Sequence, residues 1–307
     1  MAFLFKYMMH IEPTSRCILA CPGCPRTWFA GKFHHPFPKQ DLDLDDFARF
    51  MDCDSGAQVN DFLLNGNHGD PIYYPRLVEM IQRFRDRKFR ISTNGSHMPK
   101  KFWHVLAENL TIDDVIYFSI DGLEHDNHLY RRNSDWNSIM AGLDIMVKSP
   151  AKVIWKSIIF SYNQHEIAQM EQTARDRGAD FFSETTGYFG DDSLRPSDEK
   201  LIRTDMLYKH SKDAIELDPK CKDFGSEFVS ADGYYWPCCL ISNVHVLHKT
   251  QLWREKDQWC IDNQTLDRAR QRVTDWANSV KIQGPNAPSP CKMHCKVGQS
   301  GYQWANH

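Results

Sequence analysis

Short apolar runs alternate with amphipathic stretches along the first 185 residues of the chain. The runs are rich in Val, Ile and Phe and have the length of β-strands, whereas the stretches between them repeat their apolar residues at helical spacing. One such helical set is Leu77, Val78, Ile81 and Phe84. The pattern predicts strands over 6–12, 61–66, 88–93, 115–121, 153–160 and 179–185.

The alternation of strands and helices indicates the fold class. Near-continuous apolar strands separated by helices are typical of a parallel sheet covered by helices. Six units are too few for an eight-fold barrel, so we predict an α/β fold, an open or partial TIM-like barrel, over residues 1–186. In such barrels the loops after the carboxyl ends of the strands carry the chemistry.

The pattern changes after residue 186. Residues 187–220 are polar and charged, and we interpret them as a linker or active-site cover with a helical stretch over 200–211. Residues 227–236 place β-rich flanks around an Asp-Gly pair, which predicts a hairpin. One amphipathic helix then follows Leu266 to Val280, and the tail is loop-like. We therefore predict a small C-terminal domain over 221–307.

Composition excludes several classes of protein. Hydrophobic residues make up 41% of the 307 residues, enough for a substantial core, and the net charge of -3 gives no reason to expect a nucleic-acid or membrane surface. No apolar run approaches the roughly 20 residues that span a bilayer. Residues 1–16 lack the features of a signal peptide. We predict a cytoplasmic protein that binds neither nucleic acid nor membrane.

Three cysteines directly after the first predicted strand carry the first chemical signal. They are spaced as Cys17-x3-Cys21-x2-Cys24. Three thiolates with no fourth cysteine nearby suit a 4Fe–4S cluster with one iron left without a protein ligand. A structural zinc ion would need a fourth ligand. The histidines that could supply it, and so keep zinc as an alternative, are His10, His34 and His35.

With this triad on the loop after the first strand, residues 6 to about 185 resemble the radical S-adenosylmethionine (radical SAM) superfamily, whose fold is a partial (β/α)6 barrel. The resemblance implies that Cys17, Cys21 and Cys24 hold a 4Fe–4S cluster whose open iron binds the amine and carboxylate of SAM. It also implies reductive cleavage of SAM to methionine and a 5′-deoxyadenosyl radical that takes a hydrogen atom from a substrate. The chain departs from the family at Gly23, where an aromatic residue is usual.

The loops after the first four strands, taken in order, strengthen the resemblance. The first of these loops carries the three cysteines. After the second strand, Gly69-Asp70-Pro71 is similar to the family's Gly-Glu-Pro segment, which implies contact with the SAM amino group. The third and fourth strands end at Ser-Thr-Asn-Gly and Ser-Ile-Asp-Gly. Taken singly, each of the loops after the second, third and fourth strands is also consistent with a plain turn. The positions to which the resemblance assigns SAM contacts are Gly69, Asp70, Pro71, Ser92, Asn94, Ser119 and Asp121.

Further residues on or near these exits are candidates for the pocket. A lysine in a central strand needs a partner or an open cavity, and Lys156 is such a residue. Ser157 in the same strand and Asn163 after it could also face the pocket. The loop after the fourth strand leads to Tyr130, Arg131 and Arg132, which could reach a polar substrate.

A second set of cysteines brackets the hairpin and the final helix. Four thiolates bind either zinc or an iron–sulfur cluster. The arrangement resembles the twitch domain, a shortened form of the SPASM extension of radical SAM enzymes, which implies an auxiliary 4Fe–4S cluster. Cys239 could replace its neighbour Cys238 as a ligand. The predicted ligands are Cys221, Cys238, Cys291 and Cys295.

The resemblance implies a radical SAM enzyme with two 4Fe–4S clusters and SAM as cofactors. We predict net oxidation of a small polar molecule, as in the aminocyclitol dehydrogenases, with an external electron donor such as flavodoxin or ferredoxin. The alternatives are a peptide-modifying maturase or epimerase and a non-catalytic electron carrier. Only 16 residues precede Cys17, and we expect no N-terminal peptide-recognition domain there.

Overall fold

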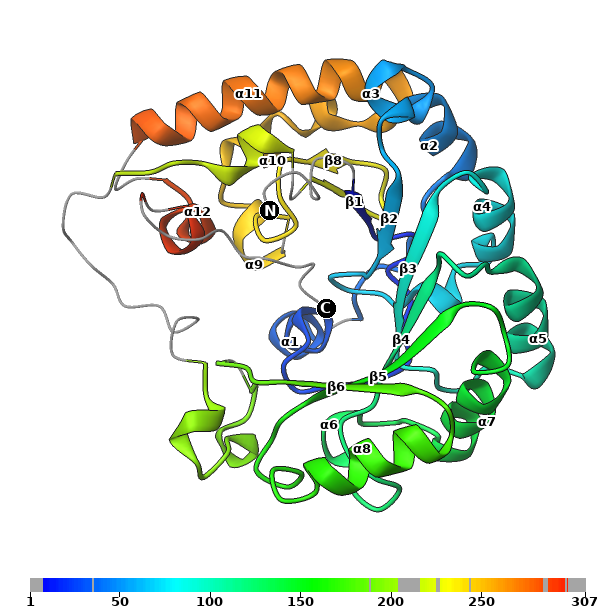
Figure 1. Ribbon diagram of the computed structural model, residues 1–307. Helices are drawn as coiled ribbons and strands as arrows, with labels where there is room; N and C mark the ends of the chain where they lie inside the picture. Colours follow the sequence, from blue (N-terminus) through cyan, green and yellow to red (C-terminus); the bar gives the residue numbers. More distant parts are fainter. Residues whose placement is uncertain are drawn as a thin grey trace. The chain divides into compact units, whose positions relative to one another are not determined.

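The structure is a computed structural model. It describes residues 8–34, 36–187, 189–203, 216–224, 227–242, 244–283, 287–295 and 297. The chain forms two compact units that interleave along the sequence. Unit 1 comprises residues 1–14, 40–67 and 208–307, and unit 2 comprises residues 15–39 and 68–207. Figure 1 shows the elements of both units.

Unit 2 contains four parallel strands that pair in the order of the chain (Figure 1). They are β3 (Lys88–Thr93), β4 (Val115–Ser119), β5 (Lys152–Ile158) and β6 (Asp180–Glu184). The helices of this unit precede, separate or join these strands. They are α1 (Pro25–Phe33), α4 (Leu77–Arg83), α5 (Lys100–Asn109), α6 (Asn127–Tyr130), α7 (Trp136–Met146) and α8 (Ile167–Asp176).

The two faces of this four-stranded sheet differ. Alternate residues point to opposite faces of a strand, and one set packs under the helices. Trp103 of α5 lies 5.3 Å from Phe118, and Trp136 of α7 lies 6.1 Å from Trp155, measured between ring centroids. The other set is half-buried and mostly polar. We call it the open face, and its members are Ser92, Tyr117, Ser119, Lys156, Ile158, Phe182 and Glu184.

In unit 1, the strands β1 (Met8–Ile11) and β2 (Asp61–Leu64) pair in parallel. The hairpin of β7 (Phe228–Val229) and β8 (Tyr235–Trp236) is antiparallel and joins β1 through β7. Gly233 takes a φ of 80° in its turn, which favours glycine. The predicted hairpin is therefore confirmed, although its pairing with β1 was not foreseen.

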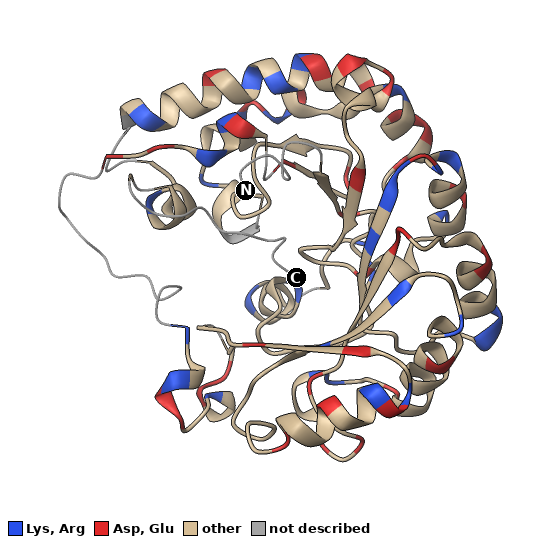
Figure 2. Ribbon diagram, viewed as in Figure 1, with Lys and Arg blue, Asp and Glu red and all other residues tan. Residues whose placement is uncertain are grey.

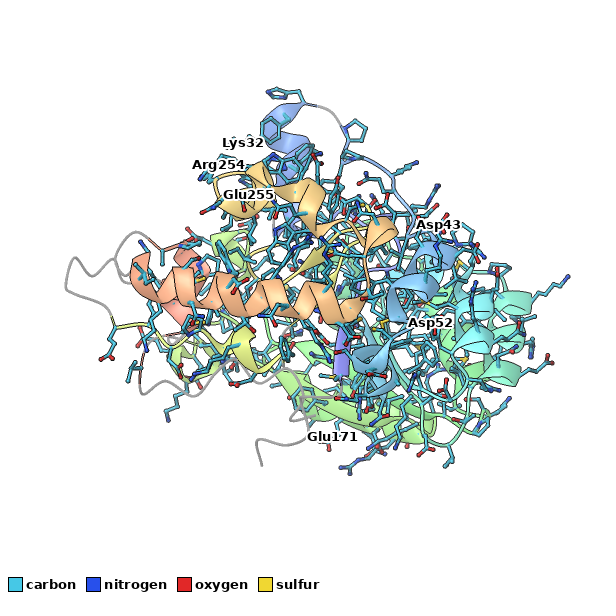
Figure 3. All side chains as sticks on the ribbon, turned by 90° about the horizontal axis from the view of Figure 1, so that it is seen from above. Lys32, Asp43, Asp52, Glu171, Arg254 and Glu255 are labelled. Atoms are coloured by element: carbon cyan, nitrogen blue, oxygen red, sulfur yellow. The ribbon has the colours of Figure 1, made fainter. Side chains whose placement is uncertain are left out.

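The helices of unit 1 surround these strands. In Figure 3, Asp43 and Asp52 mark the two ends of α2. Asp43 caps this helix by accepting the N–H groups of Asp45 and Asp46, as an N-cap aspartate does. The helices are α2 (Leu44–Met51), α3 (Asp54–Ala57), α9 (Val244–Leu247), α10 (Gln251–Arg254), α11 (Leu266–Gln283) and α12 (Ser289–His294).

A buried polar network stabilises the core of unit 1. Arg270 of α11 donates two hydrogen bonds to Glu227, at 2.6 and 3.1 Å, and the Tyr235 hydroxyl donates to the same carboxylate at 2.7 Å. All three side chains are almost completely buried. Paired and hydrogen-bonded charges of this kind avoid the cost of isolated burial, so the network fixes α11 against the hairpin.

Six strands and the long final helix agree with the sequence predictions within a few residues. The tail was predicted to be loop-like, and this is wrong, because α12 begins at Ser289 with Pro290 in its first turn, a position that suits proline. The helix predicted over 200–211 is wrong at its start. There a single 3-10 turn, Glu199–Leu201, leads to Ile202, which bridges Thr186. Residues 204–211 lie outside the described residues.

The domain boundaries at residues 186 and 220 stay a prediction. Among the helices that the structure describes, none has the length and apolarity needed to cross a bilayer. Acidic and basic side chains are interspersed along the helices, as α11 illustrates in Figure 2.

Candidate active site

The first three cysteines lie on the loop that precedes α1. Cys24 donates its N–H to the carbonyl of Cys21 at 3.0 Å, which closes a tight turn. Pro25 then starts α1, so Cys24 occupies the N-cap position of that helix. Cys21 is buried, and Cys17 and Cys24 are half-buried. The loop therefore presents three thiols at the start of a helix, where the helix dipole favours negative charge.

Apolar side chains surround this loop. Cys21 packs in a buried cluster with Leu19, Tyr130 and Phe160, and Ile158 of β5 packs against the same cluster. Gly190 approaches the loop so closely that an added Cβ would lie 2.4 Å from the backbone nitrogen of Gly23. The loop is thus held between an apolar wall and a second backbone segment.

Asp70 and Asn94 form a buried pair next to Cys17. The Asn94 backbone N–H donates to Asp70 Oδ2 at 2.6 Å, and its side-chain amide donates to the same oxygen at 2.5 Å. That amide also donates to Cys17 Sγ at 3.7 Å. Burial raises the pKa of Asp70 to about 6. Burial, and then the charge of Asp70, raise the pKa of Cys17 to about 12.

Asp121 and Arg131 form a second pair, next to Cys21. Asp121 is fully buried, and its carboxylate accepts from Arg131 Nε at 2.5 Å and from the Ile158 N–H at 2.7 Å. The charge of Arg131 favours the Cys21 thiolate, although burial is the larger effect and raises the pKa of that thiol. Burial opposes the charge on Arg131, but Asp121 and Cys21 outweigh burial and raise the pKa of this guanidinium. One buried carboxylate therefore holds an N–H donor against the Cys17 sulfur, and the other holds a positive charge that acts on Cys21.

The structure brings five predicted site residues together around the loop, namely Cys17, Cys21, Asp70, Asn94 and Asp121. Pro71 begins a 3-10 turn, Pro71–Tyr73, that Asp70 caps by accepting the N–H of Ile72, and Gly69 precedes it half-buried. Ser92 and Ser119 lie on the open face of the sheet.

Sequence reasoning underestimated Arg131. The only sequence signal was its position ten residues after Asp121. An arginine at that point has no visible pattern, because its importance comes from being buried against a carboxylate.

The three further pocket candidates lie in different environments in the structure. Lys156 lies on the open face and pairs with Glu184 at 3.1 Å. Ser157 is fully buried on the other face, with its hydroxyl 3.8 Å from the Met170 sulfur of α8. The interpretation of Ser157 as a pocket residue is therefore wrong, because neighbours on a strand face opposite ways. Asn163 is also buried, and it donates to the carbonyls of Asp121 and Ile158.

The four cysteines predicted as the second group come from separate elements of unit 1. Cys221 lies on the 3-10 helix Lys220–Asp223, Cys238 follows β8, and Cys291 and Cys295 lie on and just after α12. Burial and then the charges of the other three raise the pKa of Cys221 well above its ordinary value. The four thiols are therefore close enough to interact electrostatically.

Hydrogen bonds also organise the second group. The carbonyl of Cys295 accepts the Asp218 N–H at 2.7 Å, and Cys238 Sγ accepts the Leu240 N–H at 3.4 Å. Cys239 is almost completely buried and shares a hydrogen bond with the Cys238 thiol. Asn67 donates to the Cys239 carbonyl at 2.9 Å.

His10 is engaged elsewhere. Its Nε2 hydrogen-bonds to the carbonyl of Asn65, and its ring lies edge-on to Phe228 at 4.7 Å. Burial lowers the pKa of His10 to about 4. Of the other two histidines considered as zinc ligands, His34 is exposed at the end of α1, and His35 lies outside the described residues.

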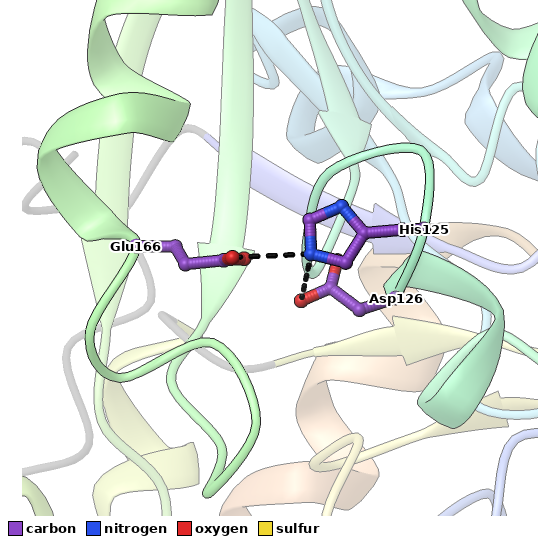
Figure 4. A group of neighbouring side chains, drawn as sticks. All are labelled: His125, Asp126 and Glu166. Atoms are coloured by element: carbon purple, nitrogen blue, oxygen red, sulfur yellow. Dashed lines mark hydrogen bonds and ion pairs between the residues drawn. The ribbon is translucent and has the colours of Figure 1, made fainter.

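One further group of polar side chains meets at the surface of unit 2. His125 and Asp126 precede α6 and Glu166 begins α8, and Figure 4 shows their polar ends facing one another. His125 Nε2 lies 3.1 Å from Glu166 Oε1 and 3.9 Å from Asp126 Oδ2. Asp126 also accepts the Leu123 N–H at 2.6 Å. Burial and then Glu166 raise the pKa of Asp126 to about 6. The three side chains thus link the segment before α6 to the start of α8.

The sulfurs around one zinc ion lie about 3.8 Å apart, because tetrahedral zinc–sulfur bonds are about 2.3 Å long. In the part of the chain that the structure describes, no three cysteine sulfurs lie within 4.8 Å of one another. The tetrahedral spacing of a zinc site is therefore not preformed at either group of described cysteines.

Comparison with known proteins places the chain in a family. The Radical SAM superfamily model matches residues 11–177, more than half of the chain. The protein therefore belongs to the radical SAM superfamily. No curated protein matches it.

Solved structures agree with this assignment. Native anSMEcpe with bound AdoMet is 15% identical, with a TM-score of 0.54 over 90% of this chain and 83% of that one. SuiB of Streptococcus suis bound to S-adenosylmethionine is 14% identical, with a TM-score of 0.55 over 93% of this chain and 77% of that one. At these identities the likeness shows the fold alone, and it confirms the predicted α/β partial barrel.

Proposed function

We propose that the protein is a radical SAM enzyme whose nucleotide site is built around Cys17, Cys21 and Cys24. The observation that carries this proposal is that two buried carboxylates hold polar groups beside these thiols: Asp70 holds the Asn94 amide that donates to Cys17, and Asp121 holds the Arg131 charge that acts on Cys21. A 4Fe–4S cluster with SAM bound supplies a 5′-deoxyadenosyl radical for hydrogen abstraction. The three cysteines would hold the cluster.

The surrounding residues prepare the site for that chemistry. Asn94 donates an N–H to the Cys17 sulfur, and the charge of Arg131 acts on Cys21. Hydrogen bonds to the ligand sulfurs and nearby charges are means by which a protein sets a cluster's reduction potential. The apolar wall of Leu19, Tyr130 and Phe160 limits the access of water. SAM contacts at Gly69, Pro71, Ser92 and Ser119 remain part of this proposal.

We further propose that Cys221, Cys238, Cys291 and Cys295 hold an auxiliary 4Fe–4S cluster of the SPASM/twitch type. These four thiols interact with one another. Cys239 instead hydrogen-bonds to Cys238, which favours Cys238 as the ligand. A cluster with four cysteine ligands has no open iron, so it supplies electron transfer rather than substrate binding.

The reaction that these parts support best is net oxidation of a small polar substrate. An auxiliary site for electron transfer suits the removal of a second electron after hydrogen abstraction. The enzyme would take its electrons from an external donor such as flavodoxin or ferredoxin, and we propose a cytoplasmic location. The balance of the reaction is the loss of two electrons and two protons from the substrate.

Peptide modification is the second candidate. One anSMEcpe structure contains a Cp18Cys peptide, and one SuiB structure contains the precursor peptide SuiA. The likeness of fold makes a peptide substrate a specific alternative for this chain. A peptide product that carries a new bond or an inverted centre would favour it over small-molecule oxidation.

The test of the proposed function is anaerobic reconstitution with iron and sulfide, followed by dithionite and SAM. We expect 5′-deoxyadenosine and methionine to form in equal amounts. An electron carrier of the same fold would yield neither product. The control is the Cys53→Ala/Cys260→Ala variant, which leaves both cysteine groups intact and should form the same products.

A further inference from the structure

The open face of the sheet in unit 2 carries an ion pair where a packed core would be apolar. Lys156 Nζ lies 3.1 Å from Glu184 Oε1, and the two side chains are 30% and 31% exposed. The faces of parallel sheets are usually covered, and their strands are apolar on both sides. A half-exposed pair of opposite charges on such a face therefore needs an explanation other than packing.

Strand register places polar groups around this pair. Ser119 of β4 is the register partner of Lys156, which is in turn the partner of Phe182 on β6. The Lys156 ammonium lies 6.0 Å from the centre of the Phe182 ring. Tyr117 precedes Ser119 by two residues, on the same face. The pair is thus flanked by hydroxyl groups and by one aromatic ring.

The same pair lies next to the cysteine loop. Ile158, two residues after Lys156 on the same face, packs against the cluster of side chains that contains Cys21. Two residues of a strand span about 6.6 Å. Glu184 is the register partner of Ile158, and its charge acts on Asp121. Lys156 and Glu184 therefore lie at the carboxyl ends of their strands, within one small molecule's length of the loop.

We propose that Lys156 and Glu184 form the substrate-binding site, and that the substrate carries a protonated amine beside a hydroxyl or carboxylate oxygen. This inference rests on the proposed function and adds the chemical class of its substrate. Glu184 accepts hydrogen bonds from the ammonium group, and Lys156 donates to the neighbouring oxygen. The hydroxyl of Tyr117, on the same face, serves a remaining polar group of the substrate. Amino sugars, aminocyclitols and amino acid units share this chemistry.

The energetics of the pair favour this role over a structural one. A partly exposed ion pair contributes little to stability, because water screens both charges. A substrate that enters between the two side chains therefore displaces an interaction of small value. Once water is excluded, each charge interacts more strongly with the substrate, and a site built for a polar group rejects analogues that lack it.

The same two strands offer a matched control. Lys152 and Asp180 form an ion pair at 3.0 Å between β5 and β6, at the opposite ends of those strands. Their side chains are 56% and 63% exposed. The control variant Lys152→Met/Asp180→Asn removes a pair of the same chemistry from the same strands without altering the proposed site.

The test uses glucosamine and glucose as probes, which differ in one amine, and follows their binding to the reconstituted protein with SAM by saturation-transfer NMR. We expect glucosamine to bind at least about tenfold more tightly than glucose. Glu184→Gln should abolish the preference for glucosamine, and Lys156→Met should weaken the binding of both probes. The control variant should bind like the wild type. Glycylserine, tested beside glucosamine, distinguishes a peptide source of the amine from a sugar source.

Three results would overturn the inference. They are equal binding of glucose and glucosamine, failure of every amine probe to bind the wild type, and an undiminished amine preference in Glu184→Gln. Formation of 5′-deoxyadenosine is measured in the same wild-type samples. Its absence would overturn the proposed function, whereas its presence without amine selectivity would overturn the substrate site alone.

Discussion

The two cysteine groups of this protein are assembled in opposite ways. The first comes from one short loop of unit 2, where Cys17, Cys21 and Cys24 lie within eight residues of sequence. The second gathers thiols from the 3-10 helix at 220–223, the end of β8 and α12, all in unit 1. The first group offers three ligands and the second offers four.

That difference indicates a division of work. Three ligands leave one iron of a cluster open to a small molecule, and four ligands close the cluster. Around the first group, two carboxylate-held side chains act on the sulfurs: Asn94 donates an N–H to Cys17, and the charge of Arg131 acts on Cys21. In the second group the described donor is a backbone N–H, that of Leu240. Under the proposed function, the first group would serve the chemistry and the second would serve electron transfer.

Removal of the first group should have the largest effect. In Cys17→Ala/Cys21→Ala/Cys24→Ala we expect no cleavage of SAM, yet about four irons per chain, because the second cluster remains. The measurements are 5′-deoxyadenosine formation and iron content after anaerobic reconstitution. The reciprocal variant, Cys221→Ala/Cys291→Ala/Cys295→Ala, should cleave SAM but not oxidise substrate. A triple variant of the first loop without any iron would contradict the two-site account.

Closing the space beside the first loop should have the next largest effect. Gly190 has a φ of 75°, and a Cβ there would lie 2.4 Å from the nitrogen of Gly23. We expect Gly190→Ala to destabilise the protein by about 1–3 kcal/mol, from crowding and from the unfavourable φ. The measurement is thermal unfolding of the metal-free protein. Gly31→Ala is the control, since nothing lies within 4 Å of its added Cβ and helical alanine is favourable.

Loss of the Arg131 donor should change the first group alone. The double variant Asp121→Asn/Arg131→Gln keeps the pair neutral but removes the guanidinium charge, which acts on Cys21 more strongly than the charge of Asp121 does. We expect the reduction potential of the first cluster to fall by about 60 mV, which for one electron equals about 1.4 kcal/mol. A redox titration followed by EPR measures both clusters. An equal fall in the second cluster would refute a local effect.

The smallest predicted effect concerns the group of His125, Asp126 and Glu166, outside both cysteine sites. The raised pKa of Asp126, about 6, means that the folded protein binds an extra proton between pH 4 and 6. The contribution of this group to the free energy of unfolding is therefore fully present below pH 4, and it is lost as the pH rises through 6. Asp126→Asn should gain on the order of 1 kcal/mol relative to wild type above pH 7. Urea unfolding at pH 5 and pH 8 checks the difference, and no difference between the two pH values would contradict it.

The position of the first cysteine group could be predicted because its three cysteines lie close together in the sequence and follow a recognisable strand. Strand positions were also readable, since each strand is bounded by polar turns. The side chains that act on the cysteines could not be predicted from the sequence, because Arg131 gains its role only by being buried against Asp121. Likewise the orientation of Ser157 depends on strand register, where a one-residue shift exchanges the two faces. The α12 helix was missed because its prolines read as loop signals.

The most direct test of the central claim is EPR of the reduced protein before and after SAM is added. We use the variant Cys221→Ala/Cys291→Ala/Cys295→Ala, so that only the first group contributes a signal. The account predicts a 4Fe–4S signal whose g-values shift when SAM binds the open iron. A spectrum unchanged by SAM, or zinc in place of iron at these three cysteines, would contradict it.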